Sequence, residues 1–208
     1  MPENQNRWAF YNNYINFPCT YIKINKVATQ TLAVAFNRVF GKSISGMPTA
    51  IKKPFIFAFV RNPYDRAVSC WLNQIVAPTE FSKNLFKDGM HKSFWRYPGL
   101  NPGMSFPDFA KVIHDIHDGQ SNPHFKSQSW FLLNGKGQLE PDYIGRFEML
   151  QEDFNVVCNR VGVNSVALPH RNRTKKRGAW KKYYKPITRD LIYERYREDF
   201  ELFGYERG

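Results

Sequence analysis

Continuous apolar runs and helically spaced apolar positions alternate along this chain. Residues 55–60 are apolar at every position, which is typical of a central strand covered on both faces. Residues 20–24 predict an earlier strand, and residues 30–40 follow with an apolar stripe of helical spacing that ends at Gly41. The first sixty residues therefore predict a strand, a helix and a strand in that order.

Helix-start signals occur twice more. Asn62 precedes Pro63, and Ser105 stands three residues before Asp108. Both patterns indicate a capped helix N-terminus. Residues 105–118 then carry apolar side chains at helical spacing, which predicts a helix over that range.

The C-terminal half continues the alternation. Residues 129–133 and 143–147 predict strands around a turn at Asn134-Gly135. One helix is expected to end at Gly162 and the last one at Gly204.

Strands that alternate with helices predict an α/β fold with a mostly parallel central sheet flanked by helices. At 208 residues the chain is long enough for a single domain, residues 1–208, with a substantial core. Residues 77–104 break the pattern with Pro, Gly, Lys and aromatic residues. Because this stretch is long for a passive connection, we expect an acceptor-binding insertion or lid there.

Charge is the unusual feature of the composition. Thirty Lys and Arg residues outnumber eighteen Asp and Glu, for a net charge of +12. The excess favours an anionic ligand, a nucleic acid or an anionic membrane surface. A content of 16% aromatic residues argues against wholesale disorder.

The cysteines and the N-terminal residues indicate the cellular compartment of the protein. No apolar run is long enough to span a bilayer, and the polar residues 1–7 do not form a signal peptide. Cys19, Cys70 and Cys158 are odd in number and lack metal-ligand spacing, which fits a reducing compartment. We expect a cytoplasmic protein, or a Golgi-lumenal one if an N-terminal anchor is missing.

One motif suits a phosphate or sulfate. Residues 21–32 predict a strand, a tight turn that carries Lys26, and a helix that opens on Thr29 and Thr31. Backbone N–H groups at a helix start, a lysine and two hydroxyls would then converge on one anion.

A second motif repeats this arrangement. Residues 55–69 predict a strand, a turn and a helix, with Arg61 at the strand end and Ser69 eight residues later. Ser69 lies almost two turns after Asn62 and shares its helix face. Two cationic turns indicate a ligand with two separate anionic groups.

The two motifs resemble the cofactor-binding elements of sulfotransferases that use 3′-phosphoadenosine 5′-phosphosulfate (PAPS). In that family the first loop, often Pro-Lys-x-Gly-Thr-Thr, binds the 5′-phosphosulfate, while an Arg and a Ser eight residues apart bind the 3′-phosphate. The resemblance implies that Arg61 and Ser69 bind the 3′-phosphate. It implies that the phosphosulfate is bound by Lys26, Val27, Ala28, Thr29, Gln30 and Thr31. Asn25 and Ala28 stand where Pro and Gly are common, so the loop is expected to sit slightly differently on its phosphate.

The resemblance extends over nearly the whole chain. Residues 143–148, 168–172 and 199–205 are similar to the branch of the family that acts on carbohydrates. The resemblance implies a P-loop-NTPase-like fold and sulfuryl transfer to a hydroxyl of a sugar or similar metabolite. The lysine and arginines would supply the positive charge, so no metal is expected.

A basic run covers residues 171–185, with eight cations in fifteen residues and aromatic residues between them. The corresponding loop of the family closes over the nucleotide, which implies phosphate contacts from Arg171, Arg173 or Lys175. The alternative is a solvated basic loop that binds polyanions non-specifically.

A general base must take the proton from the acceptor hydroxyl, and a histidine can do so near neutral pH. His124 is the first choice because residues 122–128 resemble the His-Trp-x-Pro-Gln motif of some carbohydrate sulfotransferases. His91 is a second candidate. His114 and His117 are three residues apart on a predicted helix, where a solvated face is a better interpretation than a metal site.

Two other functions compete with sulfuryl transfer. A nucleotide kinase also uses a strand, turn and helix, but its Gly-x-x-x-x-Gly-Lys-Ser/Thr run is absent from the sequence. A nucleic-acid-binding module would account for the charge and the basic run, although no nucleic-acid partner is expected. The sequence leaves the acceptor and the oligomeric state open.

Overall fold

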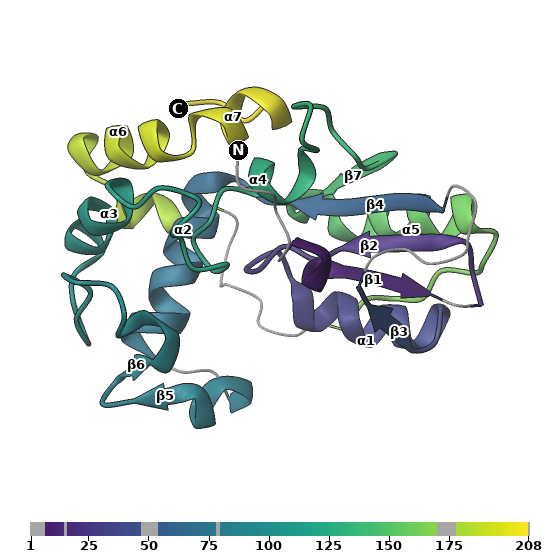
Figure 1. Cartoon of the computed structure of the whole chain (residues 1–208), viewed down its shortest axis with the longest axis horizontal. Coiled ribbons are helices and arrows are strands. Elements are labelled where there is room, and N and C mark those ends of the chain that lie inside the picture. The colour runs from purple at the N-terminus through teal and green to yellow at the C-terminus, as the bar shows by residue number, and fades with distance from the viewer. Residues whose placement is uncertain (1–6, 15, 47–53, 78–79, 170–177, 208) are drawn as a thin grey trace. The chain divides into compact units, whose positions relative to one another are not determined.

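The computed structural model describes residues 7–14, 16–46, 54–77, 80–169 and 178–207 (Figure 1). Its internal contacts divide the chain into two compact units. The first unit comprises residues 1–61 and 128–173, and the second comprises residues 62–127 and 174–208. Each unit is described by itself.

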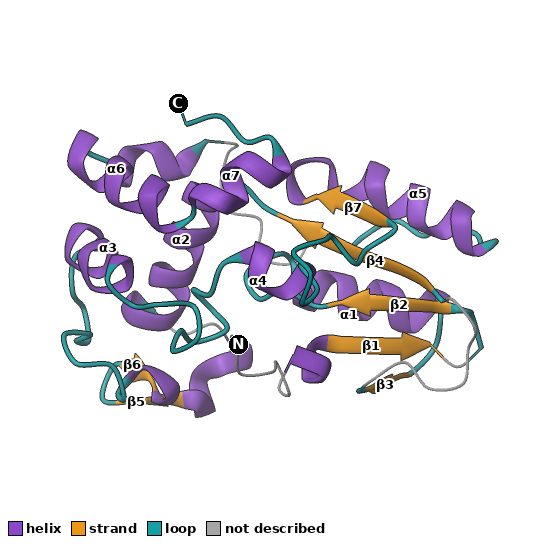
Figure 2. Ribbon diagram, turned by 45° about the horizontal axis from the view of Figure 1, so that its top comes forward, coloured by secondary structure: helices purple, strands orange, loops and turns teal. Residues whose placement is uncertain are grey.

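The first unit is built on a five-stranded sheet, whose order β3-β1-β2-β4-β7 can be followed in Figure 2. Its strands are β1 (Tyr11–Tyr14), β2 (Cys19–Ile22), β3 (Ser43–Ser45), β4 (Phe55–Val60) and β7 (Tyr143–Arg146). The two strands predicted near residues 20–24 and 55–60 lie side by side at its centre.

The sheet is mixed. β2 pairs with β4 and β4 pairs with β7 in parallel, whereas β1 is antiparallel to both β2 and β3. β1 and β2 are joined by only four residues, and so short a connection allows only an antiparallel pair. The expected α/β class with flanking helices is confirmed, while the expectation of a mostly parallel sheet holds only for β2, β4 and β7.

Helices of the first unit cover the sheet with aromatic side chains. They are the short η1 (Arg7–Phe10) and η5 (Phe147–Met149), and α1 (Thr29–Val39), α4 (Gln128–Leu132) and α5 (Leu150–Val161). Phe36 of α1 contacts Phe57 of β4 and Phe154 of α5, with ring centroids 5.5 and 5.8 Å apart. α1 and α5 therefore pack together on one face of the sheet.

One predicted strand is wrong. Residues 129–133 lie mainly in helix α4, whose Phe131 and Leu132 are buried. A short apolar run fits a buried strand and a buried helical turn equally well, so periodicity alone could not separate them. The turn at Asn134-Gly135 is present, and Leu133 and Leu139 form an antiparallel bridge across it.

The second unit is mainly helical. Its helices are α2 (Pro63–Trp71), continued by the π-helical turn η2 (Leu72–Val76), then η3 (Glu80–Leu85), η4 (Lys92–Phe94), α3 (Phe106–His114), η6 (Ala179–Tyr183), α6 (Pro186–Arg195) and α7 (Arg197–Phe203). A small hairpin joins β5 (Phe86–Lys87) to β6 (Met90–His91). No helix in the described parts of the chain is both long and apolar enough to cross a bilayer.

Local signals set the helix ends as expected. The Asn62 side chain accepts hydrogen bonds from the N–H groups of Tyr64 and Asp65, and the Ser105 hydroxyl accepts one from Asp108. The last predicted helix is instead two helices, α6 and α7, because the backbone leaves the helical region at Tyr196.

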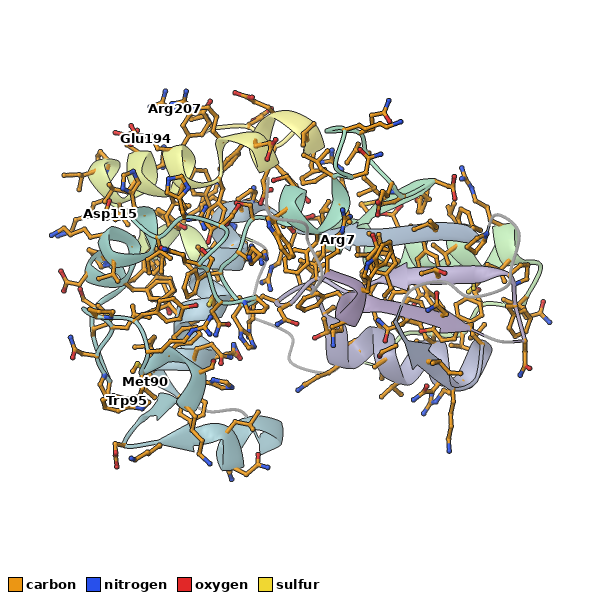
Figure 3. The ribbon with its side chains drawn as sticks, in the orientation of Figure 1. Arg7, Met90, Trp95, Asp115, Glu194 and Arg207 are labelled. Carbon is orange, nitrogen blue, oxygen red and sulfur yellow. The ribbon has the colours of Figure 1, made fainter. Side chains whose placement is uncertain are left out.

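Residues 77–104 contribute to the hydrophobic core of the second unit. Met90 and Phe94 are fully buried there, whereas Trp95 is 46% exposed (Figure 3). Asp88 and Gly89 both have positive φ, the conformation that a tight two-residue hairpin turn requires. The part of this segment from Met90 onward is therefore packed structure.

Candidate functional site

The loop between β2 and α1 has an unusual backbone. Lys26 and Ala28 have φ of 70° and 48°, in the left-handed region where a side chain costs about 1–2 kcal/mol. Two such residues within three positions indicate that the loop is held in a strained conformation. Strain of this kind is common where a backbone is shaped to receive a ligand.

The strained loop delivers the chain into helix α1 at Thr29. Ala28 is the residue that precedes the helix, and its methyl group cannot cap the N–H groups of the first turn. These groups lack acceptors within a helix and carry the positive end of the helix dipole. Thr29 and Gln30 are half-buried and Thr31 is buried. The motif of residues 21–32 therefore has the geometry expected of an anion-binding site.

Arg61 reaches this loop from the end of β4. Its guanidinium donates a hydrogen bond of 3.0 Å to the carbonyl oxygen of Lys26, and it lies 4.1 Å from the centroid of the Phe147 ring. The residue is only 4% exposed. The structure thus brings together two predicted site residues that are 35 positions apart in the chain.

Gln128 holds the backbone of Arg61. Its side-chain oxygen accepts from the Arg61 N–H, and its amide nitrogen donates to the Arg61 carbonyl oxygen, both at 2.9 Å. Gln128 is fully buried. It satisfies both backbone groups at the point where β4 ends, as a neighbouring strand would.

The carboxyl ends of the parallel strands β2 and β4 therefore carry Lys26, Arg61 and the start of α1. This end of an open α/β sheet is where ligands usually bind. Two cations and a helix N-terminus favour an anionic group at this position.

Ser69, the predicted partner of Arg61, belongs to the second unit. It lies on α2, is half-buried and lines a cavity of about 230 Å³. The other lining residues are Asp65, Val68, Leu72, Ala179, Trp180, Lys182 and Tyr183. Aromatic and cationic side chains beside a serine hydroxyl suit a flat ligand that carries an anion.

The basic run is described only in part. Arg171, Arg173 and Lys175 lie outside the described residues. Further along, Trp180 stacks on Tyr64 with ring centroids 5.4 Å apart, and the Tyr184 hydroxyl donates to the Tyr64 carbonyl oxygen at 2.9 Å. The C-terminal part of the run therefore packs on the first turn of α2.

His124 is held by Asn122 in the second unit. The Asn122 side-chain oxygen accepts from the backbone N–H of His124 at 3.0 Å and lies 2.7 Å from His124 Nδ1. Asn122 is 3% exposed, while His124 is half-buried.

His91, the second candidate base, lies beside His124. The two ring centroids are 5.3 Å apart. His91 Nδ1 lies 2.8 Å from the Ser93 hydroxyl, which in turn accepts from the Asn122 amide nitrogen at 2.8 Å. The two histidines, 33 positions apart in sequence, thus belong to one hydrogen-bonded cluster.

Helix α6 anchors the loop that carries His124. Arg195 donates to the Asp118 carboxylate at 2.6 Å and to the hydroxyls of Ser121 and Ser127, and the Tyr196 hydroxyl donates to the Phe125 carbonyl oxygen. Burial alone would raise the pKa of Asp118, but the charge and hydrogen bond of Arg195 outweigh it and hold that pKa below its ordinary value.

The other described histidine with several polar partners is His114. Its ring nitrogens lie 2.7 Å from the Asp115 carboxylate and 3.2 Å from that of Glu194, both labelled in Figure 3. Among the residues that the structure describes, no three His, Cys, Asp or Glu side chains form a group that could hold a metal ion.

Four residues of these clusters were not predicted from sequence. Gln128 and Phe147 support Arg61, and Ser93 and Asn122 connect the histidines. Asn122 stands before Pro123, a pattern that signals a turn but not the hydrogen bond to His124. Gln128 stands at the Gln of the segment that resembles the His-Trp-x-Pro-Gln motif, but its bonds to the Arg61 backbone join residues far apart in sequence. The contacts of Phe147 with Arg61 and of Ser93 with Asn122 are equally long-range.

Comparison with known proteins agrees with the geometry. The pattern of the family described as "Sulfotransferase family" matches residues 7–206. Carbohydrate sulfotransferase 12 of Mus musculus is 24% identical over 97% of this chain and 52% of its own length. Its Xenopus laevis counterpart is 28% identical over 83% of this chain and 45% of its own length.

A second group of relatives shows the same degree of likeness. Carbohydrate sulfotransferase 10 of Rattus norvegicus is 24% identical over 78% of this chain and 50% of its own length. The chain thus spans about half the length of the curated relatives it matches. No solved structure matches it significantly.

Proposed function

Because the chain belongs to the sulfotransferase family and is an enzyme of that family, we propose that it moves a sulfuryl group from PAPS to a hydroxyl group, with a carbohydrate or related metabolite as the acceptor. The observation that carries the proposal is the contact between Arg61 and the Lys26 carbonyl at the start of α1. It joins the two cationic motifs that the family uses for the nucleotide.

The loop and its lysine would hold the phosphosulfate. Residues 26–31 would donate backbone N–H groups to the 5′-phosphate, and Lys26 would lie against the bridging oxygen. As the S–O bond breaks, negative charge develops on that oxygen. A positioned ammonium group and helix N–H groups stabilise such charge without reorganisation. These cations make a metal ion unnecessary in the proposed reaction.

Arg61 and Ser69 would bind the 3′-phosphate, on the resemblance of their eight-residue spacing to that of the family. Arg61 has the planar donor set that suits a phosphate. Arg171, Arg173 and Lys175 are proposed as additional nucleotide contacts on the same resemblance.

His124 is proposed as the general base. It would take the proton from the acceptor hydroxyl at Nε2, the acceptor oxygen would attack sulfur, and adenosine 3′,5′-bisphosphate would leave with the electron pair of the broken S–O bond. The proton would pass from His124 to solvent after product release.

The proposal of a carbohydrate acceptor is supported by the relatives that are named carbohydrate sulfotransferases. The proposed compartment is the cytoplasm, because Cys19, Cys70 and Cys158 are buried thiols and form no disulfide, and such thiols persist in reducing surroundings. Burial raises the pKa of the Cys158 thiol to about 11, so that thiol is unreactive at neutral pH.

Two measurements test the proposal together. Calorimetry should show adenosine 3′,5′-bisphosphate binding more tightly than ATP or a single-stranded oligonucleotide, and labelled PAPS should pass its sulfuryl group to at least one member of a panel of sugars, lipids and alcohols. Preference for ATP would favour a kinase, and preference for the oligonucleotide would favour a nucleic-acid-binding module. Either preference, without transfer from PAPS, would overturn the proposal.

A further inference from the structure

The backbone of Arg61 lies just beyond the strand pairing of the sheet. β2 pairs with β4 as far as Ala58, and β7 pairs with β4 as far as Val60. Arg61 is the next residue and is only 4% exposed, and buried backbone polar groups need hydrogen-bond partners. The side-chain amide of Gln128 bonds both its N–H and its carbonyl oxygen, at 2.9 Å each.

These two bonds fix the Gln128 amide and the Arg61 backbone together. A backbone N–H only donates and a carbonyl oxygen only accepts, so the Gln128 oxygen faces the first group and its NH₂ group faces the second. The two bonded groups lie on either side of the Arg61 α-carbon. Bonds to both of them therefore restrain both backbone torsions and set the direction in which the Arg61 side chain leaves the chain.

Gln128 is itself anchored, because the helix α4 that it begins is bonded at its other end. The buried Arg7 side chain donates to the carbonyl oxygens of Phe131 and Leu133 at 3.1 and 2.7 Å, and to the Glu140 carboxylate at 2.8 Å. Carbonyls at a helix C-terminus lack helical donors, and an arginine can satisfy them. The amide that bonds Arg61 therefore belongs to a helix that is fixed at both ends.

We infer that Gln128 is a positioning residue for the nucleotide: it holds the Arg61 backbone so that the guanidinium is in place for the 3′-phosphate before the nucleotide binds. The guanidinium lies 4.1 Å from the centroid of the Phe147 ring and donates to the Lys26 carbonyl oxygen, and both contacts depend on where the side chain starts. A long side chain that is already ordered loses less conformational entropy on binding. The inference rests on the proposed function, which assigns the 3′-phosphate to Arg61, and adds a residue that acts through Arg61.

Calorimetry on the full chain with adenosine 3′,5′-bisphosphate and adenosine 5′-monophosphate tests the inference, because the two nucleotides differ only in the 3′-phosphate. Gln128→Met keeps a side chain of similar length and removes both bonds to Arg61. It should weaken binding of the bisphosphate about 5- to 20-fold, less than Arg61→Ala does, and change the affinity for the monophosphate less than about 3-fold.

A double-mutant cycle shows whether Gln128 acts through Arg61. In a protein that already carries Arg61→Ala, Gln128→Met should change the affinity for the bisphosphate less than about 2-fold, because the group that it positions is missing. Gln128→Asn keeps an amide on a side chain one methylene shorter. It should give the same pattern with a smaller loss, and it replaces Gln128→Met in both experiments if that variant does not fold.

Asn13→Ala is the matched control for a purely structural effect. The Asn13 side chain also bonds the backbone of the first unit, since it donates to the carbonyl oxygens of Ile44 and Gly46 at 3.3 and 2.9 Å. It lies on β1, a strand that carries none of the predicted site residues. Its loss should lower the thermal midpoint and leave the ratio of the two nucleotide affinities unchanged.

Three results would overturn the inference alone. They are an unchanged affinity of Gln128→Met for the bisphosphate, an equal loss for both nucleotides, and an equal loss with and without Arg61. A parent that binds the bisphosphate no more tightly than the monophosphate would instead contradict the proposed 3′-phosphate site, and the inference would fall with it.

Discussion

Lys26 and Arg61 have different surroundings, although both are cations that follow the ends of neighbouring parallel strands. The Arg61 side chain is buried, with its guanidinium stacked on Phe147 and bonded to the Lys26 carbonyl oxygen, so it shapes the loop as well as offering charge. Lys26 is half-buried on a strained backbone. We therefore expect their substitutions to affect different steps.

Lys26→Ala should lower turnover far more than donor affinity. If the ammonium group acts mainly on charge that develops on the leaving oxygen, kcat should fall about 100-fold or more while the Kd for the nucleotide changes less than about 10-fold. Single-turnover assays and calorimetry measure the two effects. Lys23→Ala, in the same loop, is the control and should change neither. A loss confined to affinity would make Lys26 a binding residue only.

Arg61→Ala should weaken binding of adenosine 3′,5′-bisphosphate by about 1.5–3 kcal/mol, the range for a charge-assisted hydrogen bond. Arg160→Ala is a matched control, because Arg160 also lies over aromatic rings. These are the rings of Phe55 and Tyr143, the first residues of β4 and β7, whereas Arg61 follows the last residue of β4. Calorimetry on both folded variants measures their affinities for adenosine 3′,5′-bisphosphate. Equal affinities for the two would contradict the role of Arg61.

At the scale of elements, two backbone positions are sensitive to the size of the side chain. One is the left-handed residue before α1, and the other is a glycine of β7 that packs closely on α5. Ala28 has φ of 48° just before the helix. Gly145 of β7 lies where an added Cβ would stand 2.7 Å from the Phe59 ring and 2.8 Å from Asp153 Cβ. We therefore expect glycine to stabilise the protein at position 28 and alanine to destabilise it at position 145.

Ala28→Gly should stabilise the protein by about 0.5–1 kcal/mol. Glycine removes the left-handed penalty of about 1–2 kcal/mol, and part of this gain is offset by the greater freedom of glycine in the unfolded chain. Ala33→Gly, on the exposed face of the same helix, should instead cost about 1 kcal/mol. Urea unfolding compares them. Two changes of the same sign would contradict the strained loop.

Gly145→Ala should destabilise the protein by about 1–3 kcal/mol, because the new methyl group overlaps the buried Phe59 ring and the Cβ of Asp153 on α5. Asp153 cannot easily withdraw, since it accepts hydrogen bonds from the Tyr143 hydroxyl and the Arg146 N–H. Gly135→Ala, with no atom within 4 Å of the added Cβ, is the control. A thermal midpoint equal for both variants would be evidence against the tight packing.

At the scale of the whole molecule, a chain of charge +12 buries some of its cations in specific pairs. Arg195 is the clearest case in the second unit. It has a side chain 7% exposed and contacts Asp118, whose side chain is 26% exposed. Because the pair holds the loop that carries His124, its loss should affect stability and activity together.

Asp118→Asn should cost about 2–3 kcal/mol near neutral pH, somewhat less than the loss for a fully buried pair. The folded pKa of Asp118 lies below its ordinary value of 3.8. The pair therefore stabilises the fold at any pH above the ordinary value, and the effect disappears as pH falls through the folded value. In urea unfolding the difference between parent and variant should stay constant from about pH 7 to about pH 4 and should shrink as the pH is lowered further.

Asp190→Asn is the control for this pH dependence. Asp190 pairs with Arg207 at 2.8 Å, but both side chains are more than half exposed. Solvent screens such a pair, so its removal should change stability little at any pH. A difference for Asp118→Asn that stays constant on acidification would rule out the pair as its cause.

The sequence by itself determined the features that depend on neighbouring residues. Asn62 and Ser105 begin helices because their side chains bond N–H groups two or three positions away, and β4 is apolar throughout because both of its faces are covered. The order of strand, turn and helix around Lys26 is equally local. The family resemblance followed from such motifs and their spacing.

Tertiary structure alone decided which distant residues meet. Residues 129–133 lie mainly in a helix, and the spacing of apolar residues in so short a run could not predict this. The packing of its buried side chains decides between a short strand and a short helix. Gln128 bonds the backbone of Arg61, 67 positions earlier, and Asn122 bonds Ser93, 29 positions earlier, so that the loops of His124 and His91 meet. A hydrogen bond requires its two atoms within about 3 Å, and only the folded chain brings them that close.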